Sequence, residues 1–226
     1  MQQKTSIILA LSIILIAVGV WLFIPMDNTS EEKTSVDNSE VVARVNGKDV
    51  TRGELEAIKS QIASGQGIDP SSLSEEDQKK LEDQALNALV SDTLIRQAVE
   101  KSGITASEED IENQIKAIKA QFENEEKYQE KLSEQNTSEE QIRSQVAESI
   151  AMQAYLEQNL DLDSISVSED EIKSLYEGQA ANSENLPPLE QVHDQIKSFI
   201  LQQKQQELLA KHVDKLREGA EIEILI

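Results

Sequence analysis

The sequence VVARVNGKDV at residues 41–50 is the stretch that most directly determines how this chain folds. Two short segments that fit β-strands flank Asn46-Gly47, a dipeptide that readily adopts the two positive φ angles of a type I′ turn. The segment therefore predicts a small β-hairpin. Thr51 and Glu54 follow with the spacing of an N-terminal capping box, which predicts that a helix begins directly after the hairpin.

The last six residues, EIEILI at 221–226, alternate in a way that predicts a β-strand with Ile222, Ile224 and Ile226 on one face. A lone strand is not stable in water, and the remaining strand candidates lie in the hairpin. We therefore expect the C-terminal strand to join the hairpin and to bury these three isoleucines. The folded region then spans residues 41–226.

The chain between these strands predicts a series of helices. Several begin with a serine followed by acidic residues, a combination that caps free N–H groups and suits the positive helix end. These serines are Ser74, Ser107, Ser138 and Ser168. Their spacing raises the possibility of a helical repeat, but the intervals drift and no shared pattern recurs, which favours independent helix starts. Pro187-Pro188 opens a long helix over residues 188–218.

Two of these helices carry apolar residues at helical spacing. The residues are Ile111, Ile115, Ile118, Phe122, Ile142, Val146 and Ile150. Each stripe either packs into a core, which is the commoner role, or leaves a face open that can bind another chain.

The N-terminus predicts a membrane anchor. Residues 7–24 are uncharged and apolar, long enough to cross a bilayer as a helix. Lys4 precedes them and acidic residues follow, which places residues 1–6 in the cytoplasm and the bulk outside. A cleaved signal peptide is the alternative, but the apolar run continues past its best cleavage site. Residues 25–40 are polar and acidic, and they predict a disordered tether.

Composition argues against several kinds of chemistry. The chain has 226 residues, a formal net charge of −22, two histidines and no cysteine. The acidity argues against nucleic-acid binding, and the lack of cysteine excludes disulfides, thiolate metal sites and cysteine nucleophiles. His193 and His212 point about 100° apart on one predicted helix, where each is expected to be a surface residue. With no phosphate loop or nucleophile elbow, we expect no catalytic residue, metal, cofactor or small-molecule substrate.

Three segments resemble the N-terminal chaperone domain of the SurA, PrsA and PpiD group of extracytoplasmic folding factors. They are residues 42–55, 88–98 and 101–111. The resemblance covers about residues 41–178 and implies a mainly α, multi-helix chaperone domain with a small sheet. It also implies that the long C-terminal helix and the last strand return to the N-terminal part.

Members of this group usually carry a parvulin prolyl-isomerase domain after a segment like residues 167–176. Here only residues 177–187 separate that segment from the returning helix, which is too short for a domain. The resemblance therefore implies a chaperone that is not itself an enzyme.

By this resemblance, the chain is a membrane-anchored chaperone on the periplasmic or outer side of a cell membrane. Its partners would be unfolded or nascent polypeptides, bound through the seven apolar residues named above. The alternatives are a member or accessory of the prolyl-isomerase family, and a helical scaffold that holds partners at the membrane.

Overall fold

The computed structural model describes residues 37–180 and 187–226, so the predicted anchor at 7–24 lies outside the described residues. The described chain forms two compact units. We call residues 37–104 with 213–226 the sheet unit, and residues 105–212 the helical unit. No helix in the described part of the chain is long and apolar enough to span a membrane.

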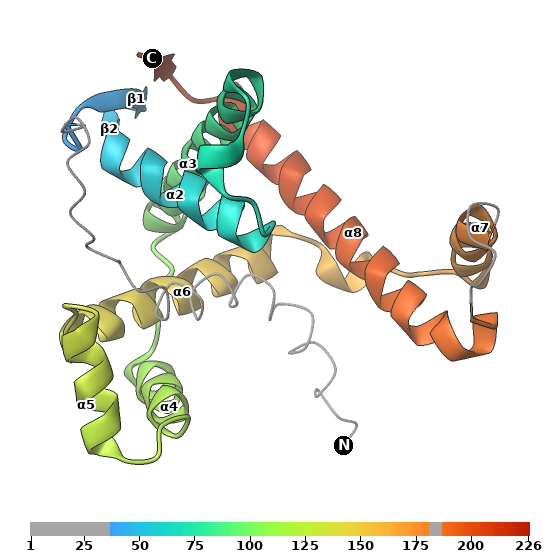
Figure 1. Cartoon of the computed structure of the whole chain (residues 1–226). Coiled ribbons are helices and arrows are strands. Elements are labelled where there is room, and N and C mark those ends of the chain that lie inside the picture. The colour runs from blue at the N-terminus through green and yellow to red at the C-terminus, as the bar shows by residue number, and fades with distance from the viewer. Residues whose placement is uncertain (1–36, 181–186) are drawn as a thin grey trace. The chain divides into compact units, whose positions relative to one another are not determined.

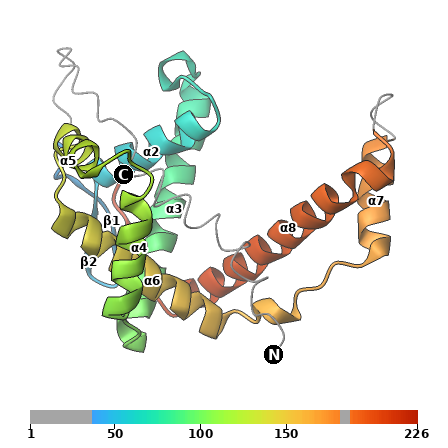
Figure 2. The same cartoon turned by 90° about the horizontal axis from the view of Figure 1, so that it is seen from below.

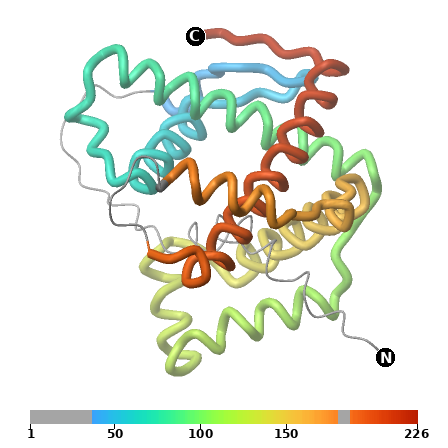
Figure 3. Tube along the Cα trace, turned by 90° about the vertical axis from the view of Figure 1, so that its right-hand side faces the viewer, coloured from blue at the N-terminus to red at the C-terminus, as the bar shows by residue number. Residues whose placement is uncertain are grey.

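The sheet unit combines both predicted strand regions (Figure 1). Its elements are β1 (Val41–Val45), β2 (Lys48–Thr51), α2 (Arg52–Gly65), a 3₁₀ turn (Pro70–Ser72), α3 (Glu75–Ser102), the end of α8 (Leu189–Glu218) and β3 (Ile222–Ile224). The strands form an antiparallel sheet in the order β2-β1-β3. Figure 3 shows the C-terminal segment running beside the hairpin. The predicted pairing of the C-terminal strand with the hairpin is therefore confirmed.

The hairpin turn also ties the sheet to its neighbours. Asn46 and Gly47 have φ angles of 50° and 80°, as predicted for this turn. The Asn46 side chain donates to Gln97 on α3 at 2.7 Å and accepts from the backbone N–H of Glu221 at 2.9 Å. One turn residue thus connects β1, α3 and the C-terminal strand. The capping box of Thr51 and Glu54 is present at the start of α2.

The core of the sheet unit lies between the sheet and helices α2 and α3. Val42, Ala43 and Val45 are completely buried, and residues of both helices pack around them. The expectation that three C-terminal isoleucines are buried is wrong: Ile222 packs at the margin of this core, but Ile224 and Ile226 are 47% and 45% exposed. β3 is one of the two outer strands, and of its isoleucines only Ile222 packs against the core between the sheet and helices α2 and α3.

The described residues before Val41 also take part in the fold. The backbone N–H of Gly53 donates to the carbonyl of Asn38 at 3.0 Å, and that of Arg52 donates to the carbonyl of Glu40 at 2.8 Å. A Cβ atom at position 53 would lie 3.2 Å from the Asn38 oxygen, so glycine permits this close approach. Residues 37–40, which the sequence assigned to the tether, therefore pack on the start of α2.

The helical unit contains α4 (Glu108–Lys119), α5 (Glu125–Glu134), α6 (Glu139–Asn159), a 3₁₀ turn (Leu162–Ser164), α7 (Glu169–Ala180) and most of α8. The predicted serine caps are confirmed, because the side chains of Ser74, Ser107, Ser138 and Ser168 each accept a backbone N–H three residues later. The predicted long helix is α8, whose last turns belong to the sheet unit.

Candidate functional site

The seven apolar residues singled out in the sequence all lie in one part of the helical unit, which we call the three-helix module (α4, α5, α6 and the loops between them). Phe122 was predicted to continue the helix of Ile111, but α4 ends at Lys119 and Phe122 lies in the loop before α5. Figure 2 shows α4 against α6. Four of the residues are buried, with exposed fractions between 1% and 7%. These are Ile111, Ile115, Ile142 and Val146. The other three, Ile118, Phe122 and Ile150, are partly buried and pack at the margin of the same cluster. We call these three the apolar margin.

Helix α5 completes the cluster through two residues that were not among the predicted site residues. Tyr128 is 2% exposed and Leu132 is 6% exposed. The Tyr128 ring meets the Phe122 ring edge-on, with centroids 5.4 Å apart. The only sequence signal was their spacing of one helical turn within a short, highly charged segment, which is weak by itself. The contribution of α5 to the apolar cluster is therefore clear only from the structure.

Ion pairs border the module and connect its helices. Lys119 of α4 lies 2.8 Å from Glu139 of α6 and 3.3 Å from Glu125 of α5, and its pKa is raised chiefly by the hydrogen bond to Glu139. Its ammonium group also lies 5.0 Å from the centre of the Tyr128 ring. Arg143 of α6 pairs with Glu112 of α4 at 2.7 Å. Exposed pairs of this kind stabilise a fold only modestly, so the apolar cluster carries most of the stability of the module.

One polar atom inside the cluster is unsatisfied. The hydroxyl of Tyr128 is buried and has no hydrogen-bond partner among the described residues. Burial is also the main reason why the pKa of Tyr128 is raised. A buried donor without a partner keeps the cost of its lost hydration, about 1–3 kcal/mol.

We expect the substitution Tyr128→Phe to leave the stability of the protein unchanged or to increase it by about 1 kcal/mol, because it removes the unsatisfied hydroxyl and keeps the ring. Tyr155→Phe is the matched control, since the Tyr155 hydroxyl lies 2.9 Å from Nε2 of His212. That variant should lose about 0.5–1.5 kcal/mol. Denaturant unfolding of both variants measures the difference, and equal losses would mean that the Tyr128 hydroxyl has a partner.

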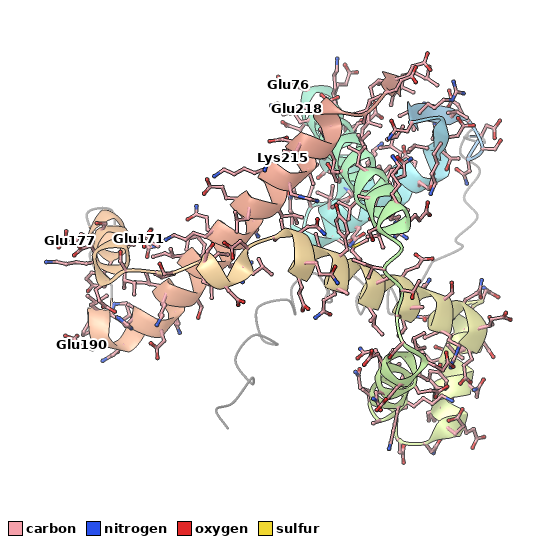
Figure 4. All side chains as sticks on the ribbon, turned by 180° about the vertical axis from the view of Figure 1, so that it is seen from behind. Glu76, Glu171, Glu177, Glu190, Lys215 and Glu218 are labelled. Carbon is pink, nitrogen blue, oxygen red and sulfur yellow. The ribbon has the colours of Figure 1, made fainter. Side chains whose placement is uncertain are left out.

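A second apolar cluster joins α7 to the first half of α8. Ile172 is completely buried between them, together with Ile196 and Ile200. Lys204 of α8 lies 2.6 Å from Glu171 of α7. This hydrogen bond is the main reason why the pKa of Glu171 is lowered to about 2. Figure 4 shows Glu171 and Glu177 on α7 and Glu190 on α8. Acidic side chains therefore lie on both helices that make this apolar contact.

The two histidines serve different contacts. His193 lies 3.0 Å from Glu169 and 3.1 Å from Asp194, and its pKa is raised chiefly by the hydrogen bond to Glu169. His212 is partly buried and bonds to Tyr155, so the prediction of a simple surface position is wrong for it. Within residues 37–180 and 187–226, no group of three or more histidine and carboxylate side chains is arranged to hold a metal ion.

The comparisons with known proteins agree with this architecture. Residues 1–156 match the family model described as the SurA-like N-terminal domain. No curated protein matches the chain. A solved structure, from a study of the virulence factor PEB4 and the periplasmic protein Cj1289 as related SurA-like chaperones of Campylobacter jejuni, has a similar fold. It is 14% identical, has a TM-score of 0.53, and its match covers 82% of this chain and 98% of that one. The family match spans more than half of the sequence, and the chain therefore belongs to the SurA-like N-terminal domain family.

Proposed function

We propose that this protein is a chaperone that binds unfolded polypeptides outside the cytoplasm. Membership of the SurA-like family carries the proposal, and the similar solved structure comes from work on SurA-like chaperones, one of them described as periplasmic. Both comparisons point to a chaperone rather than to a catalytic domain.

The apolar margin is the part of the three-helix module that we assign to client binding. Ile118, Phe122 and Ile150 are only partly buried, so they retain apolar surface that another chain can contact. The four buried residues of the predicted site support this surface from beneath. The excess of acidic residues around it keeps the protein soluble while apolar surface is exposed.

Residues 7–24 are proposed to anchor the chain in the membrane, with residues 25–36 as the tether that leads to the folded part. The uncharged apolar run and the charges on either side of it support this assignment. Membrane fractionation of the full-length chain tests it.

The functional test is suppression of aggregation of an unrelated unfolded protein by the full-length chain. We expect Ile118→Glu to weaken the suppression several-fold, because a carboxylate in the apolar margin must be desolvated when a client binds. Ala117→Glu is the matched control, since it adds the same charge at an exposed position of the same helix. Protection by the wild type should persist in moderate salt, where charge interactions are screened beyond about 8 Å.

Two results would contradict these proposals separately. If the wild type gives no protection at several-fold molar excess, the protein is not a chaperone of this kind. If Ile118→Glu protects as well as Ala117→Glu, clients bind elsewhere. Acceleration of proline isomerisation in a test peptide would instead favour the enzyme alternative.

A further inference from the structure

The outer edge of the C-terminal strand is not paired with another strand in the described part of the chain. Within residues 221–226, the N–H of Leu225 donates to the carbonyl of Val42 at 3.0 Å, and the carbonyl of Glu221 accepts from the N–H of Asn46 at 2.8 Å. Hydrogen-bonding positions alternate along an antiparallel strand. The odd-numbered residues therefore direct their backbone groups towards β1, and the even-numbered residues direct theirs to the opposite edge. No strand among residues 37–180 and 187–226 pairs with that edge.

This edge carries no lysine, proline or bulge, which are three of the features that prevent strand addition, although β3 is short and carries Glu223. The bulge of the sheet lies between Val41 and Ala43, where β1 pairs with β2. Three of the four large apolar residues that are strongly exposed in the described part of the chain are consecutive here. They are Ile224, Leu225 and Ile226, each at least 45% exposed. Among the described residues, the edge is therefore unpaired, and exposed apolar side chains lie along it.

The two faces of the strand have different chemistry. The even-numbered face carries Ile222, Ile224 and Ile226 and continues from the margin of the sheet-unit core. The odd-numbered face carries Glu221 and Glu223, followed by Leu225. A strand added along the edge would thus meet apolar side chains on one face and mainly carboxylates on the other.

The acidic face stays negative despite one nearby cation. Arg44 lies 3.2 Å from Glu223, but it also lies 2.7 Å from Asp49, so one guanidinium serves two carboxylates. The side chain of Glu223 remains 58% exposed. A cationic side chain on an added strand could therefore pair with the carboxylate of Glu223.

The same charges argue against a second copy of this chain as the added strand. In an antiparallel pair of two such strands, Glu223 would lie opposite or diagonal to a glutamate of the copy, and like charges at those positions are destabilising. Each copy also brings a net charge of −22. A strand of complementary charge is favoured instead.

We propose that the outer edge of residues 221–226 binds an extended client segment as an added antiparallel strand. The preferred segment alternates apolar residues with lysine or arginine. Residues directly opposite each other share a face of the sheet, so the apolar residues of the client lie beside Ile224 and its cations lie beside Glu223. The inference rests on the proposed chaperone function and adds to it a binding site and a sequence preference.

N-methylated peptides test the proposal on the full-length wild-type protein. In antiparallel addition, the amides of the apolar client residues point at the edge, and those of the lysines point away. An acetylated octapeptide of alternating valine and lysine should bind in a fluorescence anisotropy assay. N-methylation of its valines should weaken binding at least about tenfold, and N-methylation of its lysines should leave binding unchanged. All these peptides carry the same charge, so equal binding, or the reverse order, would overturn the proposal.

A protein variant gives an independent check. Ile224→Pro removes an N–H that points to the outer edge and keeps the bonds to β1, whereas Ile224→Val keeps both the N–H and an apolar side chain. The proline variant should bind the unmethylated peptide at least about tenfold more weakly than the valine variant, at equal thermal stability. Should the proline variant melt earlier, the peptide series decides alone.

Failure of this inference is distinguishable from failure of the proposed function. If the wild type suppresses aggregation but methylated and unmethylated peptides bind alike, the chaperone assignment stands and the strand-addition site is refuted. If the wild type neither suppresses aggregation nor binds the peptides, both are refuted.

Discussion

Ile115→Glu is expected to unfold the three-helix module. Ile115 is 4% exposed and belongs to the same apolar cluster as Tyr128 and Ile142. Loss of its burial costs about 1.5–3 kcal/mol, and a buried carboxylate without a partner adds several kcal/mol more. The sum is comparable with the total stability of a typical domain, about 5–15 kcal/mol. Amide hydrogen exchange resolved to α4, α5 and α6 should show loss of protection throughout the module.

Two further substitutions serve as controls for Ile115→Glu. Ile115→Val removes one methyl group and should cost about 0.5–1.5 kcal/mol without unfolding. Ile118→Glu introduces the same charge three residues later, at the partly exposed margin, and should leave the module folded. If Ile115→Glu were as stable as Ile118→Glu, Ile115 would not be a core residue.

The difference between Ile115 and Ile118 shows how much of the candidate site the sequence could predict. The helical spacing of Ile111, Ile115 and Ile118 correctly predicted an apolar face on α4, because periodicity reports which residues share a face. Periodicity does not report how deep each residue lies. That depends on the neighbouring helices, and here Tyr128 and Leu132 of α5 close the cluster from a segment with a weak signal of its own.

The same distinction applies to the sheet. The turn at Asn46-Gly47 and the serine caps were predictable because their chemistry is local to a few residues. The C-terminal strand and its partner followed from alternation and from the instability of a lone strand. The exposure of the C-terminal strand could not be predicted, because the same alternation fits a strand in the middle of a sheet and a strand at its edge. The structure places β3 at the edge, where Ile224 stays half exposed.

Deletion of residues 221–226 should nevertheless lower the stability of the sheet unit by about 2–4 kcal/mol. The deletion removes the whole pairing of β3 with β1, including the backbone bonds to Val42 and Asn46. It also removes the bond between the Asn46 side chain and Glu221, and the partly buried Ile222. Each such hydrogen bond contributes about 0.5–1.5 kcal/mol net. The deletion also turns β1, with the fully buried Val45, into an edge strand. For a chain of this size, the melting temperature should fall by about 5–15 °C.

A double variant separates the strand from its exposed side chains. Replacing Ile224 and Ile226 by threonine keeps the backbone bonds and a β-branched shape, so it should cost less than about 1 kcal/mol. If the melting temperatures of the deletion and of the double variant both lie near that of the wild type, the segment is frayed and its pairing with β1 does not stabilise the protein. If both lose several kcal/mol, the two isoleucines are buried in solution, and the open edge proposed as a binding site does not exist. Only a large loss for the deletion with a small loss for the double variant fits a strand that is firmly held by β1 on one side and free on the other.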